Sequence, residues 1–149
     1  MLNIPKDFRE FIQLLNENDV KYLIVGGYAV GYHGHPRSTG DIDIFISTEI
    51  KNAKAILNCL KKFGFGQLGI STNDLTEKEQ VIQLGYPPLR IDILTSIDGI
   101  KFSEAWNNRI TEKIDDLSLS FISLKDLLIN KKSSNRLKDL TDFEELNPG

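Results

Sequence analysis

The sequence predicts an α/β (α+β) protein in which helices flank a central mixed β-sheet. Apolar residues recur with the helical period over residues 5–16 and 49–63, whereas acidic and aliphatic residues alternate with the strand period over residues 41–46. A second alternating run covers residues 89–95. Because helical and strand segments follow one another along 149 residues, about the length of one domain, we expect one sheet with helices packed on it.

Local signals delimit the elements of the first half of the chain. Pro5 suits the first turn of a helix, and a short apolar run that ends in Gly26-Gly27 predicts a buried strand followed by a tight turn. Thr48 is the expected cap of the next long helix, which Gly64 ends. The expected elements are a helix at residues 5–16, a strand at 21–25, a short helix at 28–32, a strand at 41–46 and a helix at about 49–63.

The second half offers fewer signals. A turn at Gly85-Tyr-Pro-Pro88 separates two expected strands, and Ser123 with Asp126 resembles a capping box at the start of a helix. We expect one domain over residues 1–149, with the sheet at about 20–97 and C-terminal helices at about 100–146. Within these bounds we expect strands at residues 80–84 and 89–95 and helices at 102–109, 124–132 and 137–146, with a polar stretch at 71–79.

Composition excludes several classes of protein. Apolar residues make up 40% of the chain and charged residues 26%, the balance of a water-soluble globular domain. Cys59 is the single cysteine, which excludes an intrachain disulfide and fits a reducing compartment. The longest nearly apolar run, residues 22–32, is far shorter than the roughly 20 residues that span a bilayer. We therefore expect a cytoplasmic protein without a membrane partner, and the net charge of -3 argues against a basic surface for long nucleic acid.

Two strands carry acids in a pattern that predicts a site. Asp41 and Asp43 share one face of their strand while aliphatic residues take the other, and Asp92 projects from its own strand in the same way. Neighbouring carboxylates repel each other unless a cation lies between them, and Mg²⁺ prefers such oxygen ligands. The alternative is that these acids line a solvated edge of the sheet, where an isolated Asp-x-Asp pair is common.

The glycine pair after the first strand is a candidate phosphate-binding turn. Gly26 and Gly27 would allow the backbone to approach a phosphate closely, and a following helix would offer free amide donors. Taken alone, two glycines after a strand are more often just a turn. The spacing adds weight, since thirteen residues separate Gly27 from Asp41.

Taken together, these motifs resemble those of the nucleotidyltransferase superfamily typified by DNA polymerase beta. The matching segments are Val-Gly-Gly at residues 25–27, Asp-Ile-Asp-Ile at 41–44 and Ile-Asp-Ile at 91–93. Arg-Ser-Thr-Gly-Asp-Ile-Asp at residues 37–43 is similar to a stretch of the small bacterial AbiEii-type toxins. The basic and acidic residues of the tail, at 131–142, resemble the same group.

This resemblance implies transfer of a nucleoside monophosphate from a nucleoside triphosphate, such as ATP, to an acceptor hydroxyl. Asp41 and Asp43 would ligate two Mg²⁺ ions, and Asp92 would complete the metal site and take the proton from the acceptor. The acceptor would be a protein, a tRNA or a small molecule, as in toxin-antitoxin, abortive-infection or antibiotic-modifying systems. The alternative is a non-catalytic module that binds nucleotide or a partner protein encoded by a paired gene.

The resemblance also implies phosphate contacts outside the acidic strands. Gly26 and Gly27 would hold the phosphates through backbone amides, and Lys131 would reach them as a mobile point charge. Arg37 and Thr39 would contact phosphate or brace the loop before the acidic strand. For Arg37 an ion pair with a nearby carboxylate, and for Lys131 a solvated helix end, remain open alternatives.

Overall fold

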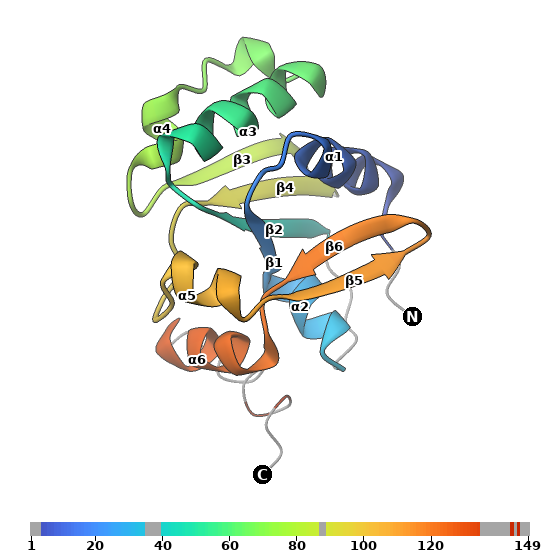
Figure 1. Cartoon of the computed structure of the whole chain (residues 1–149), viewed down its shortest axis with the longest axis vertical. Coiled ribbons are helices and arrows are strands. Elements are labelled where there is room, and N and C mark those ends of the chain that lie inside the picture. Colours follow the sequence, from blue (N-terminus) through green and yellow to red (C-terminus); the bar gives the residue numbers. More distant parts are fainter. Residues whose placement is uncertain (1–3, 35–39, 87–88, 135–143, 145, 147–149) are drawn as a thin grey trace.

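The fold is a six-stranded mixed sheet with helices on both faces (Figure 1). The computed structural model describes residues 4–34, 40–86, 89–134, 144 and 146. The strand order is β3-β4-β2-β1-β6-β5. In chain order the elements are α1 (Lys6–Glu17), β1 (Tyr22–Val25), α2 (Gly26–Tyr32), β2 (Asp41–Ile46), α3 (Ile50–Lys62), a 3₁₀ turn η1 (Gly66–Leu68), α4 (Thr72–Thr76), β3 (Val81–Tyr86), β4 (Leu89–Leu94), α5 (Phe102–Asn107), β5 (Ile110–Ile114), β6 (Leu117–Phe121) and α6 (Leu124–Ser134).

Both parallel and antiparallel pairs occur in the sheet. β2 pairs in parallel with β4, and β1 in parallel with β6. The pairs β1–β2, β3–β4 and β5–β6 are antiparallel. The expected mixed sheet flanked by helices is therefore confirmed.

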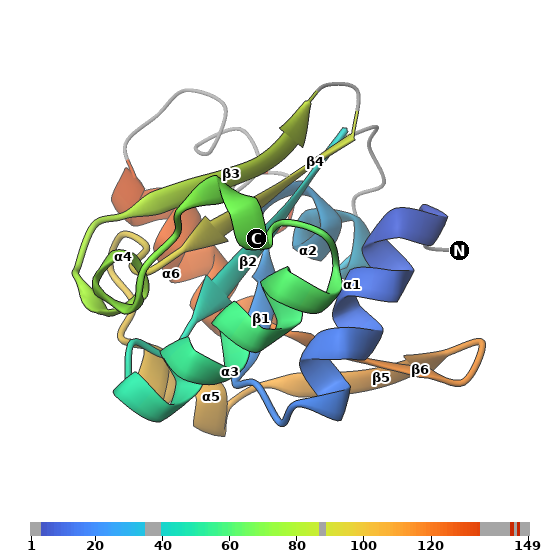
Figure 2. The ribbon, with the colours of Figure 1, turned by 90° about the horizontal axis from the view of Figure 1, so that it is seen from above.

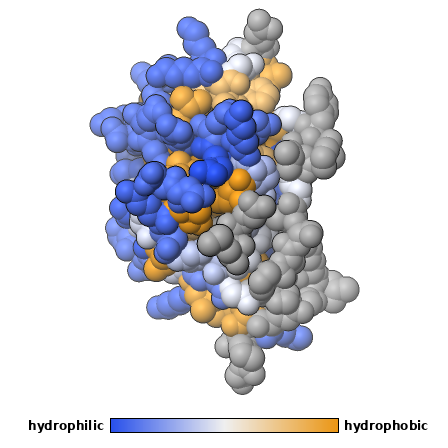
Figure 3. Space-filling model, turned by 90° about the vertical axis from the view of Figure 1, so that its right-hand side faces the viewer, coloured by the Kyte–Doolittle hydropathy of each residue, from blue (hydrophilic) through white to orange (hydrophobic). Residues whose placement is uncertain are grey.

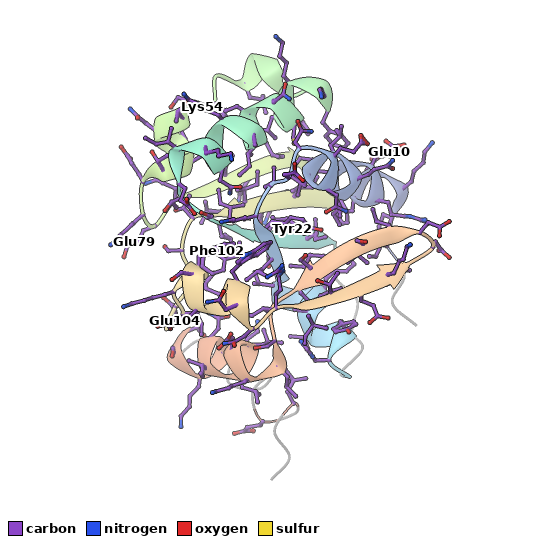
Figure 4. All side chains as sticks on the ribbon, viewed as in Figure 1. Glu10, Tyr22, Lys54, Glu79, Phe102 and Glu104 are labelled. Atoms are coloured by element: carbon purple, nitrogen blue, oxygen red, sulfur yellow. The ribbon has the colours of Figure 1, made fainter. Side chains whose placement is uncertain are left out.

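Two layers of helices cover the sheet. Figures 1 and 2 show α1 and α3 on one face and α2, α5 and α6 on the other. Ile42, Ile44 and Ile46 of β2 are buried. Phe45, on the opposite face of β2, meets Phe102 of α5 edge-on at a ring separation of 5.1 Å. Phe102 points from α5 toward the strands in Figure 4, so the odd-numbered residues of β2 face the layer of α2, α5 and α6.

The β5–β6 hairpin corrects the expected extent of the sheet. The sequence predicts the sheet at about residues 20–97 with only helices beyond it, whereas two further strands extend the sheet to Phe121. The hairpin turns at Asp115 and Asp116, whose φ angles are 49° and 69°. Aspartate tolerates this left-handed backbone, so Asp-Asp was the available turn signal. β5 is exposed along almost its whole length, and so it lacks the buried face that produces an alternating pattern.

Three smaller differences from the expected elements concern the start of α2, the start of α3 and the presence of α4. α2 begins at Gly26 itself, without a separate turn before it. Thr48 does not cap α3, since the N-cap position is Glu49 and no side chain caps it. A short helix, α4, occupies part of the expected polar stretch, where the side chains of Ser71 and Asp74 form a capping box. One of the two hydrogen bonds of the expected capping box of α6 is confirmed, because the Asp126 amide donates to the Ser123 hydroxyl at 3.2 Å.

The surface agrees with the composition. The face shown in Figure 3 is mostly hydrophilic where it is coloured, with apolar residues between the polar ones. Charged side chains such as Glu10, Lys54 and Glu79 project outward in Figure 4. None of the helices in the described ranges is long and apolar enough to cross a lipid bilayer. The expected helix at residues 137–146 lies almost entirely outside the described residues.

Candidate active site

The three predicted aspartates come together on two neighbouring strands. The parallel register of β2 and β4 places Asp43 beside Asp92, and adjacent strands lie about 4.8 Å apart. Asp41 lies two residues before Asp43, on the same face of β2. Asp92 is buried, with 7% of its surface exposed, whereas Asp41 and Asp43 are half-buried. The sheet thus brings Asp92 into one cluster with Asp41 and Asp43, from which it is separated by about fifty positions in the sequence.

Gly26 lies against this cluster because of the antiparallel pairing of β1 and β2. That register pairs Val25, the last residue of β1, with Asp43. Gly26 follows with a φ of +64°, which turns the chain from β1 into α2. A Cβ atom on Gly26 would overlap Oδ2 of Asp43 and lie 2.9 Å from its Cγ. Glycine is therefore required here both by the backbone conformation and by the close approach of a carboxylate.

Gly27 is buried in the first turn of α2. β1 ends and β2 begins at the same end of the sheet, because the two strands are antiparallel. Both glycines consequently lie at the end of the sheet where the acidic cluster is. The predicted neighbourhood of the glycine pair and the aspartates is observed, while the role of the glycines in binding phosphate stays a prediction.

Arg90 also belongs to the cluster, although no motif in the sequence predicts a role for it. Its Nε donates to Asp92 Oδ1 at 2.9 Å, and its Nη2 donates to Asp92 Oδ2 at 3.2 Å. The same Nη2 donates to Asp41 Oδ2 at 3.0 Å. A signal for this residue was present, since Arg90 and Asp92 are two residues apart in a strand and must share a face.

The ion pairs keep Arg90 charged. Its hydrogen bond with Asp92, together with the charges of Asp92, Asp41 and Asp43, raises the pKa of Arg90 above its usual value. The Arg90 side chain is 26% exposed, and the Asp92 side chain is 10% exposed. A two-point contact with a carboxylate fixes the plane of both groups. Arg90 therefore orients Asp92 and neutralises part of the charge of the cluster.

The chemistry of the cluster suits a divalent cation, because carboxylate oxygens are the ligands that Mg²⁺ prefers. Within residues 4–34, 40–86, 89–134, 144 and 146, however, no three His, Cys, Asp or Glu side chains are grouped so as to hold a metal ion. Two of the three aspartates are instead bridged by Arg90. The donor set fits the predicted metal, and the side-chain arrangement is that of an ion-paired cluster.

The remaining predicted residues are Lys131, Arg37 and Thr39. Lys131 is in the last turns of α6 and is only 4% exposed, so it is not the solvated helix end that was the open alternative. α6 lies with α2 and α5 on one face of the sheet (Figure 1), and this is the face to which the odd-numbered residues of β2 point. Arg37 and Thr39 are outside the described residues, as are the tail positions from 135 to 142. The phosphate-binding roles of all three side chains stay predictions.

Comparison with known proteins assigns the chain to a family. No curated protein matches the sequence. Among solved structures, the lincosamide antibiotic adenylyltransferase LnuA with bound lincomycin has a TM-score of 0.59 and 17% identity, over 98% of each chain. The structure of ANT(2″)-Ia in complex with adenylyl-2″-tobramycin has a TM-score of 0.56 and 11% identity, over 93% of this chain and 84% of that one.

A third similar structure is an antigenic nucleotidyltransferase-like protein from Paracoccidioides brasiliensis, with a TM-score of 0.56 and 18% identity over 94% of this chain and 73% of that one. At these identities the likeness concerns the fold. The resemblance to AbiEii-type toxins in particular is not among these findings. Residues 3–147, nearly the whole chain, match a single family, and the protein belongs to that family, described as nucleotidyltransferase of unknown function (DUF6036).

Proposed function

We propose that the protein is a magnesium-dependent nucleotidyltransferase that moves a nucleoside monophosphate from a nucleoside triphosphate, such as ATP, to an acceptor hydroxyl. The observation that carries this proposal is the cluster of Asp41, Asp43 and Asp92 on β2 and β4. Its position beside the Gly26 turn, in a chain of a nucleotidyltransferase family, supports the same activity. A solvated edge of the sheet would not require a glycine to make room for a carboxylate.

In this reaction the acceptor oxygen forms a bond to the α-phosphorus, and the bond to the departing pyrophosphate breaks. Asp92 accepts the proton of the acceptor hydroxyl. Asp41 and Asp43 would hold two Mg²⁺ ions, which neutralise the triphosphate and the developing charge. The backbone of Gly26 and Gly27 and the side chains of Arg37, Thr39 and Lys131 are proposed to position the phosphates.

The acceptor is proposed to be a small hydroxylated molecule. Two structures with the same fold are antibiotic adenylyltransferases or carry an adenylylated antibiotic, namely LnuA with lincomycin and ANT(2″)-Ia with adenylyl-2″-tobramycin. The net charge of -3 disfavours a long RNA. The resemblance to AbiEii-type toxins supports a protein or tRNA acceptor in a toxin-antitoxin system, with a partner protein from a paired gene, and these acceptors are tested alongside.

One observation favours a second candidate, a non-catalytic module that binds nucleotide or a partner protein. Arg90 engages both oxygens of Asp92 and one oxygen of Asp41. A site in which an arginine permanently replaces the metal would bind nucleotide without turnover. The two candidates differ in whether label from the α-phosphate reaches an acceptor.

The test is a label-transfer assay. The purified protein, Mg²⁺ and α-phosphate-labelled triphosphates are mixed with cell extract separated into small molecules, RNA and protein. Asp43→Asn removes one charge of the cluster at nearly constant volume. Asp116→Asn makes the same chemical change at the exposed turn of the β5–β6 hairpin and serves as the matched control.

We expect label in the small-molecule fraction with the wild type and with Asp116→Asn, and a loss of at least about a hundredfold with Asp43→Asn. Label in the protein or RNA fraction would overturn the small-molecule acceptor and favour a protein or tRNA acceptor. Equal labelling by Asp43→Asn and the wild type would refute the catalytic role of the cluster. Nucleotide binding without label in any fraction would favour the non-catalytic module.

A further inference from the structure

Arg90 occupies the position between two of the three carboxylates. The parallel register places Arg90 of β4 opposite Asp41 of β2, two residues before the Asp43–Asp92 pair on each strand. Its side chain can therefore reach back to Asp92 on its own strand and across to Asp41 on the next. The three N–O distances lie between 2.9 and 3.2 Å, and such charge-assisted hydrogen bonds are among the stronger polar contacts in proteins.

The two contacts of Arg90 differ in kind. Asp92 is bound at both oxygens by two separate nitrogens and is almost buried. Asp41 is bound through one oxygen by a nitrogen that is already shared with Asp92, and 37% of its side chain is exposed. The contact to Asp41 is thus the one that can be exchanged for another cation with less rearrangement, because it involves one hydrogen bond at the more solvated carboxylate.

We infer that Arg90 is a positioning residue that competes with the divalent cation for Asp41 while it holds Asp92 in place. This inference rests on the proposed function, in which Asp41 is a metal ligand. When metal and triphosphate bind, Asp41 exchanges the guanidinium for the cation, and the two-point contact with Asp92 is kept. The exchange makes metal binding weak unless the negative charge of the triphosphate supports it, so the site binds metal mainly together with its nucleotide.

The competition is tested by metal binding in the absence of nucleotide. Mn²⁺ serves as the probe, and its free concentration is followed by electron paramagnetic resonance during titration of the full chain. Arg90→Gln removes the charge and the bridge, whereas Arg90→Lys keeps the charge but cannot contact two carboxylates in the same fork geometry. Arg109→Gln removes an equal charge from an arginine that stacks on Trp106 and serves as the matched control.

We expect Arg90→Gln to bind Mn²⁺ at least about tenfold more tightly than the wild type, because a positive charge within a few ångströms of the cation is removed. Arg90→Lys should fall between the two, and Arg109→Gln should match the wild type. Circular dichroism confirms that each variant is folded. Unchanged or weaker Mn²⁺ binding by folded Arg90→Gln would overturn the inference.

Label transfer separates this inference from the proposed function. In Arg90→Gln we expect kcat to fall while the Mg²⁺ concentration for half-maximal rate also falls, since Asp92 loses its orientation and the competing charge is gone. A merely structural role would not move these two quantities in that combination. If the wild type transfers no label, the proposed activity fails, whereas the Mn²⁺ titrations still decide whether Arg90 competes for the carboxylates.

Discussion

Replacing Gly26 with alanine tests the close approach of the glycine turn to the acidic cluster. The substitution adds one methyl group at a position with a φ of +64°. The added Cβ would overlap Asp43 Oδ2 and lie 2.9 Å from Cγ. Either the Asp43 carboxylate or the start of α2 must move, and both belong to the candidate active site.

The expected decrease in the free energy of unfolding of Gly26→Ala has two parts. A residue with a Cβ in the left-handed region costs about 1–2 kcal/mol. Forcing an additional group into a packed site costs about 1–3 kcal/mol more. Gly69 provides a matched control, because its φ is +73° and a Cβ there would have no neighbouring atom within 4 Å. The difference between the two variants therefore isolates the overlap with Asp43, for which we expect about 1–3 kcal/mol.

The free energy of unfolding is measured by urea titration with circular dichroism for wild type, Gly26→Ala and Gly69→Ala. The single variant Asp43→Ala and the double variant Gly26→Ala/Asp43→Ala complete the cycle. In it, Cβ of residue 43 remains 3.1 Å from the added methyl group, and the carboxylate atoms that overlap are gone. Much of the additional cost should therefore disappear. The label-transfer assay should show loss of activity in Gly26→Ala and wild-type activity in Gly69→Ala.

Two results would refute this reasoning. Equal destabilisation by Gly26→Ala and Gly69→Ala would mean that the added methyl group does not displace Asp43. Additive effects of the substitutions at Gly26 and Asp43 would mean that the two residues are not coupled. In either case the position of the glycine turn against the aspartates would be wrong.

Two further predictions concern the framework that carries the site. Burial raises the pKa of Tyr22 from 10.0 to about 12; this phenol therefore ionises first in the unfolded chain, and the stability of the wild type relative to Tyr22→Phe should be constant below about pH 10 and fall by up to about 3 kcal/mol as the pH rises to 12, as urea titrations of both proteins at increasing pH would show. Asn52 of α3 accepts from the Lys21 amide at 2.7 Å and donates to the carbonyls of Lys21 and Ser47 at 3.1 and 2.8 Å. Asn52→Ala removes this partner from the Lys21 amide and the Ser47 carbonyl, whereas the Lys21 carbonyl still accepts from the Ser47 amide at 3.3 Å, and urea unfolding should show a loss of about 2–4 kcal/mol.

Each of these predictions has a control on the same element or position. Tyr22→Phe cannot ionise, so an equally steep alkaline loss of stability in this variant would contradict the role of the phenol. Asn58 also lies on α3 and makes one exposed hydrogen bond, to Asn18. Asn58→Ala should cost less than about 1 kcal/mol. A loss as large as that of Asn52→Ala would show that the buried hydrogen bonds of Asn52 do not set the effect.

Local patterns predicted the elements whose signals are local. The alternation of acids and aliphatics in β2 and β4 was sufficient to place Asp41 and Asp43 on one face of a strand and Asp92 on a strand of its own, because side chains alternate across any strand. The hairpin of β5 and β6 was missed, since an exposed edge strand has no buried face to impose a pattern. The α4 helix was missed because its five residues carry little periodicity.

The contacts within the candidate site were beyond such patterns. Arg90 touches Asp41 only because β2 and β4 are neighbours in one register, although 49 positions separate these residues in the chain. Gly26 lies against Asp43 only because β1 and β2 are antiparallel neighbours whose register pairs Val25 with Asp43. Neither residue spacing nor composition specifies which strands pair.

The sequence by itself determined the mixed α/β class, the two acidic strands and the glycine turn, because each follows from backbone periodicity or from the conformational freedom of one residue type. Only the tertiary structure decided that an arginine lies between two of the acids and that a glycine makes room for the third. The physical reason is that strand pairing depends on how the whole sheet buries its apolar faces, and residues distant in the chain acquire their distances from that packing.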